Sequence, residues 1–261
     1  RLAAVDQALM TSAEVEDLLR DYEAKEGIEL NAEQRRAVHL ASDNSFVLIT
    51  GGAGVGKTTV LKALYQVYDQ AGIEVVQLAL AGRAAKRMQE ATGRAASTIA
   101  NFLRAAKELS GPFVVVVDEA SMVDIVSMYR LCELLAPDVR LVLAGDPEQL
   151  MPVGPGLVLH ALIRVPAVPL GELKVIKRYG GDIAAAAVSI RKGIWPSLSN
   201  DETDAIAFIP CDDTRTAAGT SLIAETVLDL YRLDPESTQI LSARRNGPDG
   251  VKTINSLCQA E

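Results

Sequence analysis

A glycine-rich loop that follows an apolar segment is the feature that most constrains how this chain can fold. Residues 45–50 read SFVLIT, which predicts a buried strand, and residues 51–59 read GGAGVGKTT. The loop matches the pattern GxxxxGK[ST], in which glycines let backbone N–H groups converge on phosphate oxygens. Residues 60–68 then carry apolar side chains at helical spacing. The order strand, loop and helix predicts a phosphate-binding loop, here called the P-loop (residues 51–58), within an α/β domain.

The alternation of strand and helix continues after the P-loop. Apolar runs predict strands at 74–80, 113–117 and 140–144, and helices at 83–91, 97–109 and 124–135. Before the P-loop, we expect a helix at 12–26 and a second helix that is capped by Asn31. Strands of this kind, separated by helices, indicate a parallel sheet with helices on both faces.

A change of structural unit is expected near the proline-rich stretch 166–169. We therefore predict an N-terminal helical segment at 1–29, a first domain at 30–170 and a second at 171–261. In the last of these, a weaker pattern predicts helices at 182–192, 216–232 and from about 249, and strands at 205–209 and 238–241.

Two residues of the P-loop carry side-chain chemistry. Lys57 is placed to reach the β- and γ-phosphates of a nucleotide, and Thr58 to bind Mg²⁺ through its hydroxyl. The remaining predicted nucleotide contacts are Gly52, Gly54, Val55, Gly56 and Thr59.

Acidic residues follow the valine-rich strand at 113–117. Ligands of open α/β sheets bind at the carboxyl ends of the strands, so Asp118 is a candidate Mg²⁺ ligand. Glu119 can orient and deprotonate an attacking water. An acidic helix N-terminus is the alternative, but the position downstream of a complete P-loop favours catalysis.

A third polar element, GDPEQ at 145–149, follows the apolar strand at 140–144. Gln149 could touch a terminal phosphate or a water coupled to it. An ordinary turn built from Gly145, Asp146 and Pro147 would have the same sequence. A functional role for this element is therefore favoured only because the P-loop and the Asp118–Glu119 pair are also present.

Together these segments resemble the RecD family of superfamily-one DNA helicases, which includes the exodeoxyribonuclease V alpha subunit. The segments that carry the resemblance are LNAEQRRAV (30–38), GGAGVGKTT (51–59), AGRAAKRM (81–88), ATGRAASTI (91–99), VVVVDEASMVD (114–124), LAGDPEQLMPVGPG (143–156) and ILSARRNGPDGVKTIN (240–255). The resemblance implies a P-loop NTPase fold with a RecA-like sheet, and part of a second RecA-like domain. It also implies ATP and Mg²⁺ as cofactors.

Residue roles follow from the same resemblance. Gln34 matches the glutamine that reads adenine, and Gln149 matches the sensor of the γ-phosphate. Arg178 aligns with an arginine that reaches the γ-phosphate from the second domain, although a surface charge is its alternative. The candidate DNA contacts, for which a solvated basic helix face is the alternative, are Arg83, Lys86, Arg87 and Thr98.

The sequence departs from the family mainly on the DNA side. Ala81, Ala100 and Asn101 stand where the family usually has polar or basic residues that hold a strand. The family's motifs V and VI are expected beyond Glu261. We therefore expect this chain to bind Mg·ATP but to hydrolyse it weakly by itself.

The resemblance predicts an ATP-dependent DNA helicase, or a translocase that moves 5′→3′ on single-stranded DNA, in recombination or repair. The alternative is an interaction subunit that binds ATP but has lost unwinding, which the altered DNA side favours. A small-molecule kinase is disfavoured, because it has no evident need for Gln34 or the GDPEQ element.

Composition limits the partners. The net charge of −8 argues against a generally basic nucleic-acid surface, although a local groove could still hold a strand. No apolar run reaches the length of a membrane helix, and no signal peptide is evident, so we expect no membrane partner.

Cys132, Cys211 and Cys258 form no CxxC pair, which favours a reducing cytoplasm. The isolated His39 and His160 are expected to be structural. Single-stranded DNA is the expected partner, with other recombination or nuclease subunits as further candidates.

Overall fold

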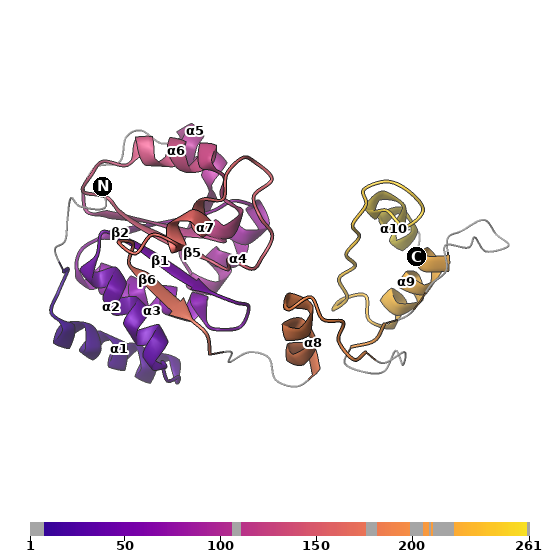
Figure 1. The fold of residues 1–261 in the computed structure, drawn as a ribbon, viewed down its shortest axis with the longest axis horizontal. Coiled ribbons are helices and arrows are strands. Elements are labelled where there is room, and N and C mark those ends of the chain that lie inside the picture. Colours follow the sequence, from indigo (N-terminus) through magenta and orange to yellow (C-terminus); the bar gives the residue numbers. More distant parts are fainter. Residues whose placement is uncertain are drawn as a thin grey trace. The chain divides into compact units, whose positions relative to one another are not determined.

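The computed structural model describes residues 8–105, 111–175, 182–198, 206–208, 210 and 222–259. The chain divides into two compact units, Arg1–Gly180 and Gly181–Glu261. Figure 1 labels most of the helices and strands.

The first unit is built on a six-stranded parallel sheet with the order β3-β2-β4-β5-β1-β6. The strands are β1 (Phe46–Gly51), β2 (Glu74–Ala79), β3 (Ala96–Thr98), β4 (Phe113–Asp118), β5 (Arg140–Gly145) and β6 (Leu170–Leu173). The predicted α/β fold with a parallel sheet is confirmed. Since β1 lies between β5 and β6, the P-loop begins at an interior strand rather than at an edge.

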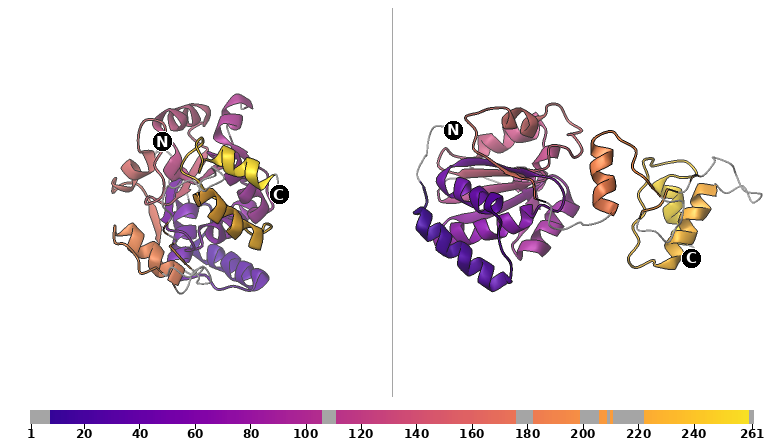
Figure 2. Two further views of the ribbon diagram at one scale, coloured as in Figure 1. Left: turned by 90° about the vertical axis from the view of Figure 1, so that its right-hand side faces the viewer. Right: turned by 60° about the horizontal axis from the view of Figure 1, so that its bottom comes forward.

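Helices cover both faces of this sheet (Figures 1 and 2). They are α1 (Ser12–Glu26), α2 (Ala32–Asp43), α3 (Lys57–Gln70), α4 (Gly82–Thr92), α5 (Ile99–Ala105), α6 (Ile125–Leu134) and α7 (Val158–Ile163), with a short 3-10 helix, η1 (Ala120–Met122). Alternate residues of one strand enter different cores: Val114 and Val116 pack with α1, α2 and α3, whereas Val115 and Val117 pack with α6 and α7. Burial on both faces explains why β4 reads as an unbroken run of valines.

The helix predicted at 12–26 is part of this first unit. Val15, Leu19 and Tyr22 of α1 are buried in the same core as the apolar side chains of α2 and α3. Arg35 of α2 also bridges Glu16 and Glu23 of α1, with N–O distances of 2.6 Å to each carboxylate. The segment 1–29 therefore does not form a body of its own in its described residues.

Strand β3 was not predicted, because its residues fall at the start of the helix expected at 97–109. Residues 96–98 instead pair with β2, and helix α5 begins at Ile99. The buried side chain of Gln77 explains the pairing, because its Nε2 donates to the carbonyls of Arg94 and Ala95 at 3.0 and 3.2 Å. These bonds hold the short polar segment at the sheet edge.

Strand β6 corrects the expected domain boundary after residue 170. Residues 170–173 pair with β1, and Leu48 N donates to the Pro169 carbonyl at 2.9 Å, so the proline-rich stretch is a loop inside the first unit. A Cβ on Gly171 would lie 2.8 Å from Ala37 Cβ, which shows how closely β6 packs on α2. The two compact units divide ten residues later, at Gly180 and Gly181.

The end of β6 is also bonded to the first turn of α2. Glu33 Oε2 accepts hydrogen bonds from the backbone N–H groups of Lys174 and Val175, at 2.7 and 3.2 Å. These two bonds are the main reason why the pKa of Glu33 lies below its usual value. The segment that leaves the sheet is thus attached to α2.

The second unit contains three helices in its described residues: α8 (Asp182–Arg191), α9 (Leu222–Leu233) and α10 (Val251–Cys258). The strand predicted at 238–241 is wrong, since these residues are irregular and Leu241 is 85% exposed. Of the strand predicted at 205–209, the described residues show an isolated bridge at Ala207. The RecA-like character of this unit stays a prediction. In the described residues of the whole chain, no helix is long and apolar enough to span a membrane.

Candidate nucleotide-binding site

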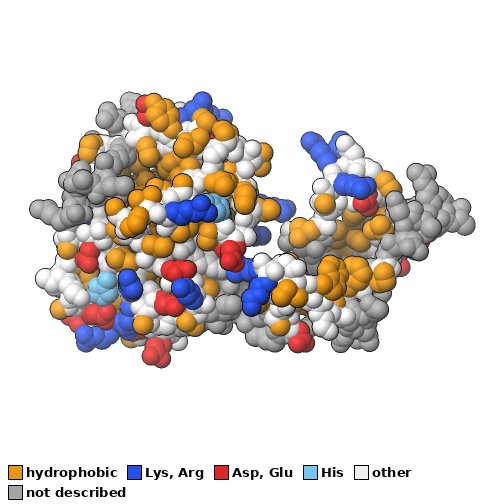
Figure 3. All heavy atoms as spheres, viewed as in Figure 1, with side chains coloured by type: hydrophobic (Ala, Val, Ile, Leu, Met, Phe, Trp, Pro, Cys, Tyr) orange, Lys and Arg blue, Asp and Glu red, His pale blue; other side chains and the backbone are white. Residues whose placement is uncertain are grey.

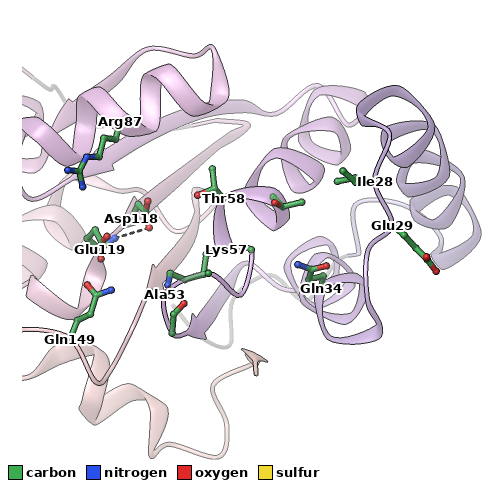
Figure 4. Close-up of a pocket in the computed structure, with 14 residues that line it drawn as sticks. Ile28, Glu29, Gln34, Ala53, Lys57, Thr58, Arg87, Asp118, Glu119 and Gln149 are labelled. Atoms are coloured by element: carbon green, nitrogen blue, oxygen red, sulfur yellow. Dashed lines mark hydrogen bonds between the residues drawn. The ribbon is translucent and has the colours of Figure 1, made fainter. Parts of the chain in front are cut away.

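A pocket of about 720 Å³ lies at the carboxyl ends of β1 and β4, beside the start of α3 (Figure 4). Segments from six parts of the sequence meet there, including α2, α4 and the loop after β5. The lining residues are Ile28, Glu29, Gln34, Gly52, Ala53, Gly54, Gly56, Lys57, Thr58, Thr59, Arg87, Asp118, Glu119 and Gln149. Most residues predicted to serve a nucleotide are therefore brought together.

The backbone of the P-loop depends on glycine at two positions. Gly54 and Gly56 have φ angles of +78° and +90°, in the left-handed region that side chains disfavour. A Cβ on Gly56 would also collide with Nε2 of Gln34. Gly56 is the N-cap of α3 and supplies no side-chain cap, so the first N–H groups of α3 are suited to bind an anion.

Lys57 folds back over the P-loop. Its Nζ donates to the carbonyls of Gly51 and Gly52 at 2.7 and 3.0 Å. Its charge also acts on Asp118 and Glu119, lowering the pKa of both carboxyls. The lysine thus lies between the P-loop and the acidic end of β4.

Asp118 ends strand β4 and faces the pocket. Its Oδ1 accepts a hydrogen bond of 2.9 Å from the backbone N–H of Glu119. Burial raises the pKa of Asp118 and outweighs both this bond and the charge of Lys57, which lower it. A buried carboxylate whose charge is not fully compensated by its neighbours is suited to bind a cation.

Glu119 has a strained backbone and a side-chain oxygen without a partner. Its φ of 53° is the only positive φ found at a non-glycine position in the described residues, and such a conformation costs about 1–2 kcal/mol. Its Oε2 is buried and accepts no hydrogen bond from the residues described. Burial raises the pKa of Glu119, and the charge of Asp118 raises it further. These properties suit a carboxylate that takes up a proton.

The other end of the pocket is formed around Gln34, whose side chain is almost fully buried. Its Oε1 accepts from Asn31 N at 3.0 Å, while Asn31 Oδ1 accepts from Gln34 N at 2.9 Å, which completes a capping box for α2. Gln34 Nε2 donates to the carbonyl of Val55 at 3.1 Å. One glutamine therefore caps α2 and fixes the P-loop to it.

Gln149 enters the pocket from the loop after β5. Its backbone N–H donates to the carbonyl of Asp146 at 3.1 Å. His160 of α7 holds the same loop, because its Nε2 donates to the carbonyl of Pro147 at 2.7 Å. This contact gives His160 the structural role that was predicted.

Comparison with known proteins decides the family. The sequence matches the AAA domain family over residues 29–207. This chain is an AAA domain protein. The match covers the P-loop, Asp118 at the end of β4, Glu119 after it and the Gln149 loop.

Two relatives of this AAA domain protein carry RecD names. The ATP-dependent RecD2 DNA helicase of Deinococcus radiodurans is 31% identical over 241 residues, covering 88% of this chain and 32% of the relative. The RecBCD enzyme subunit RecD of Mycolicibacterium smegmatis is 36% identical over 276 residues, covering 87% and 50%. The chain thus spans a third to a half of these relatives, and the predicted resemblance to the RecD family is confirmed. A crystal structure of Pif1 helicase from Candida albicans is 20% identical, with a TM-score of 0.49 over 78% of this chain and 55% of that one.

Several predicted residues of the AAA domain protein lie outside the pocket. Val55 is buried in the core, and its carbonyl holds Gln34. Thr98 ends β3, where its Oγ1 accepts from Asn101 N at 3.1 Å. Arg83 and Lys86 are exposed on α4 away from the pocket. Arg178 lies outside the described residues.

Arg87, which was predicted to contact DNA, is among the residues that line the candidate nucleotide pocket, and its contact with DNA stays a prediction. Ile28 and Glu29 line the pocket as well, and sequence patterns gave no indication of either. Helical spacing places Arg83 and Arg87 on one face of α4. The spacing therefore could not predict that Arg87 lines the pocket while Arg83 does not.

Proposed function

We propose that this chain is the nucleotide-binding motor region of a RecD-type DNA helicase, or of a translocase that moves 5′→3′ on single-stranded DNA. The proposal rests on one observation: Lys57, Thr58, Asp118, Glu119 and Gln149 line a single pocket. These residues lie at or just after the carboxyl ends of three neighbouring strands, β1, β4 and β5, where parallel sheets bind their ligands. We propose ATP as the substrate and Mg²⁺ as the metal.

The P-loop would bind the phosphates through backbone N–H groups and Lys57. The lysine can exchange its bonds with the Gly51 and Gly52 carbonyls for bonds to phosphate oxygens, which are charged and bind it more strongly. The N-terminus of α3 adds its dipole to this attraction.

Thr58 and Asp118 would hold the magnesium ion. A hydroxyl and a carboxylate are oxygen ligands of the kind that Mg²⁺ prefers, and both residues line the pocket next to Lys57. The raised pKa of Asp118 supports this assignment, because a bound cation would relieve the cost of its buried charge. When bound, Mg²⁺ neutralises charge on the phosphates.

Glu119 is the proposed general base. Its unpartnered Oε2 can accept a hydrogen bond from the attacking water, and its raised pKa makes it a better proton acceptor. Gln149, on a loop that His160 holds in place, would contact the terminal phosphate or that water.

Gln34 and Ile28 form the end of the pocket proposed for adenine. Gln34 presents an amide that matches the edge of an adenine ring, and Ile28 supplies apolar surface. In the structure both ends of the amide are engaged. Adenine recognition would therefore need one of these bonds to be shared or exchanged.

Arg178 is proposed as a further ligand of the γ-phosphate of ATP. DNA is the proposed second substrate, and Arg83, Lys86 and Thr98 are its proposed contacts. On the face drawn in Figure 3, Lys and Arg side chains are mixed with Asp and Glu, and the coloured residues form no continuous basic stripe. We therefore expect a DNA strand to bind in a local groove rather than along a continuous basic surface. The name of one relative, an ATP-dependent DNA helicase, favours this proposal over an interaction subunit. Other recombination or nuclease subunits are proposed partners, and the cytoplasm is the proposed location.

The test measures binding of a fluorescent ATPγS, and ATP turnover with and without an oligothymidylate. We expect Mg²⁺-dependent binding, and weak turnover that rises when single-stranded DNA is present. Absence of nucleotide binding would overturn the site. Nucleotide binding with no DNA affinity in any nucleotide state would overturn the motor function and support an interaction subunit.

A further inference from the structure

Helix α4 carries three neighbouring cations, Arg83, Lys86 and Arg87, which the sequence pattern treats alike. The structure separates them. Lys86 lies near Glu90 on the exposed face, with an N–O distance of 3.8 Å. Arg83 and Arg87 are both exposed, but only Arg87 of the two lines the pocket, together with Lys57 and Glu119.

The place of Arg87 along the pocket indicates what it would contact. Figure 4 shows Gln34 and Ile28 at one end, Lys57 and Thr58 in the middle, and Arg87 at the other end beside Glu119. A nucleotide with its base near Gln34 and its first phosphates on the P-loop must direct its terminal phosphate toward Arg87.

Charge leads to the same assignment. Lys57 and Arg87 are the two cations among the lining residues, and Lys57 belongs to the P-loop. Within the described part of the chain, Arg87 makes no hydrogen bond or ion pair, although its charge acts on Glu119. Its planar group therefore has N–H donors available, in a geometry that matches two phosphate oxygens at once.

We propose that Arg87 is a ligand of the terminal phosphate of the bound nucleoside triphosphate, and not a DNA contact. This inference rests on the proposed function and adds a residue to its site. Because ADP lacks the terminal phosphate, Arg87 makes the pocket distinguish the triphosphate from the diphosphate. It does so from the same unit of the chain that carries the P-loop.

The experiment compares the affinities of the full chain for fluorescent Mg·ATPγS, Mg·ADP and an oligothymidylate. For Arg87→Ala we expect an approximately tenfold loss of ATPγS affinity, with ADP and DNA affinities within about twofold of the original chain. Arg87→Lys keeps the charge but not the planar group, so it should recover only part of the ATPγS affinity.

The matched control is Arg36→Ala, which removes an exposed arginine from α2 at a position outside the pocket. It should leave the ratio of ATPγS to ADP affinity unchanged. Thermal melting would check that each variant is folded.

Two results would overturn the inference. The first is a loss of DNA affinity in Arg87→Ala with an unchanged ratio of ATPγS to ADP affinity. The second is no change in any affinity. Both leave the proposed function standing if the unsubstituted chain binds both nucleotides, whereas failure of that chain to bind either one overturns both proposals.

Discussion

The two ends of the candidate nucleotide pocket are built in opposite ways. At the end proposed for the phosphates, Glu119 has a strained backbone, an unpartnered buried oxygen and a raised pKa. At the end proposed for the base, Gln34 is buried with hydrogen bonds at both ends of its amide. The first arrangement lowers the stability of the fold, and the second raises it.

This difference separates two kinds of functional residue. A group that must accept a proton is most useful when its charge and its lone pairs are not already satisfied. A group that recognises a flat ring must be held in place, and the same bonds can hold the protein together. Substitutions at the two ends should therefore change stability in opposite directions.

Lys57→Ala should have the largest effect. Loss of the cation between the P-loop and Asp118 should lower Mg·ATP affinity by about 100-fold or more and abolish measurable turnover, since charged hydrogen bonds contribute about 1.5–3 kcal/mol each. Titration calorimetry and a phosphate-release assay would measure both. Lys62→Ala, on the same helix but paired with Glu26, is the control. Unchanged turnover in Lys57→Ala would contradict the site.

Glu119→Gln should separate binding from hydrolysis. The amide keeps the shape of the side chain but cannot take up a proton, so turnover should fall by about 10²–10⁴-fold. Nucleotide affinity should stay within about threefold, because the P-loop is unchanged. Loss of binding as great as the loss of turnover would indicate a structural role for Glu119.

Gln34→Ala should weaken both the fold and the site. It removes part of the capping box of α2 and the bond to the Val55 carbonyl, which together contribute about 1–3 kcal/mol to the free energy of unfolding. Adenine nucleotide affinity should fall by about tenfold. Chemical denaturation and nucleotide titration measure the two effects.

The matched variant for Gln34 is Asn31→Ala, which removes the cap but no residue of the pocket. It should lower stability with little effect on nucleotide affinity. If it weakened affinity as much as Gln34→Ala, the adenine role of Gln34 would be unnecessary.

Asp118→Asn should have the smallest effect on stability among these substitutions, and that effect should be a gain. Burial raises the pKa of Asp118 in the folded state, so its negative charge is disfavoured there, and stability is lost as pH rises from the ordinary value of 3.8 through the raised one. The amide avoids this loss, and Tm at pH 7 without Mg²⁺ should rise by about 2–4 °C.

The gain should disappear below pH 3.8, where Asp118 is protonated in both folded and unfolded states. Glu74→Gln, at an exposed carboxyl at the start of β2, should leave Tm nearly unchanged. A lower Tm in Asp118→Asn at pH 7 would mean that the buried charge stabilises the fold.

Local sequence patterns were sufficient to predict much of the fold of the first unit. β1, β4 and β5 are apolar runs that remain buried on both faces, and a full P-loop pattern requires the turn seen at Gly54 and Gly56. The strands that were missed, β3 and β6, are short and held by long-range contacts, from Gln77 in one case and α2 in the other.

The candidate site was predictable to a similar degree. Motif spacing identified Lys57, Asp118 and Gln149 as members of one site, and the pocket contains all three. The strain at Glu119 and the position of Arg87 depend on how β4 and α4 pack in three dimensions. Neither leaves a pattern in the local sequence.

The attachment of β6 has a mechanical consequence. Glu33 binds the amides of Lys174 and Val175, and a Cβ on Gly51 would lie 2.6 Å from the carbonyl of Leu173. A force that pulls on the chain beyond Val175 would therefore load the first turn of α2, one residue from Gln34, and the residue at which the P-loop begins. The affinity of the pocket for a nucleotide should then vary with tension along this segment.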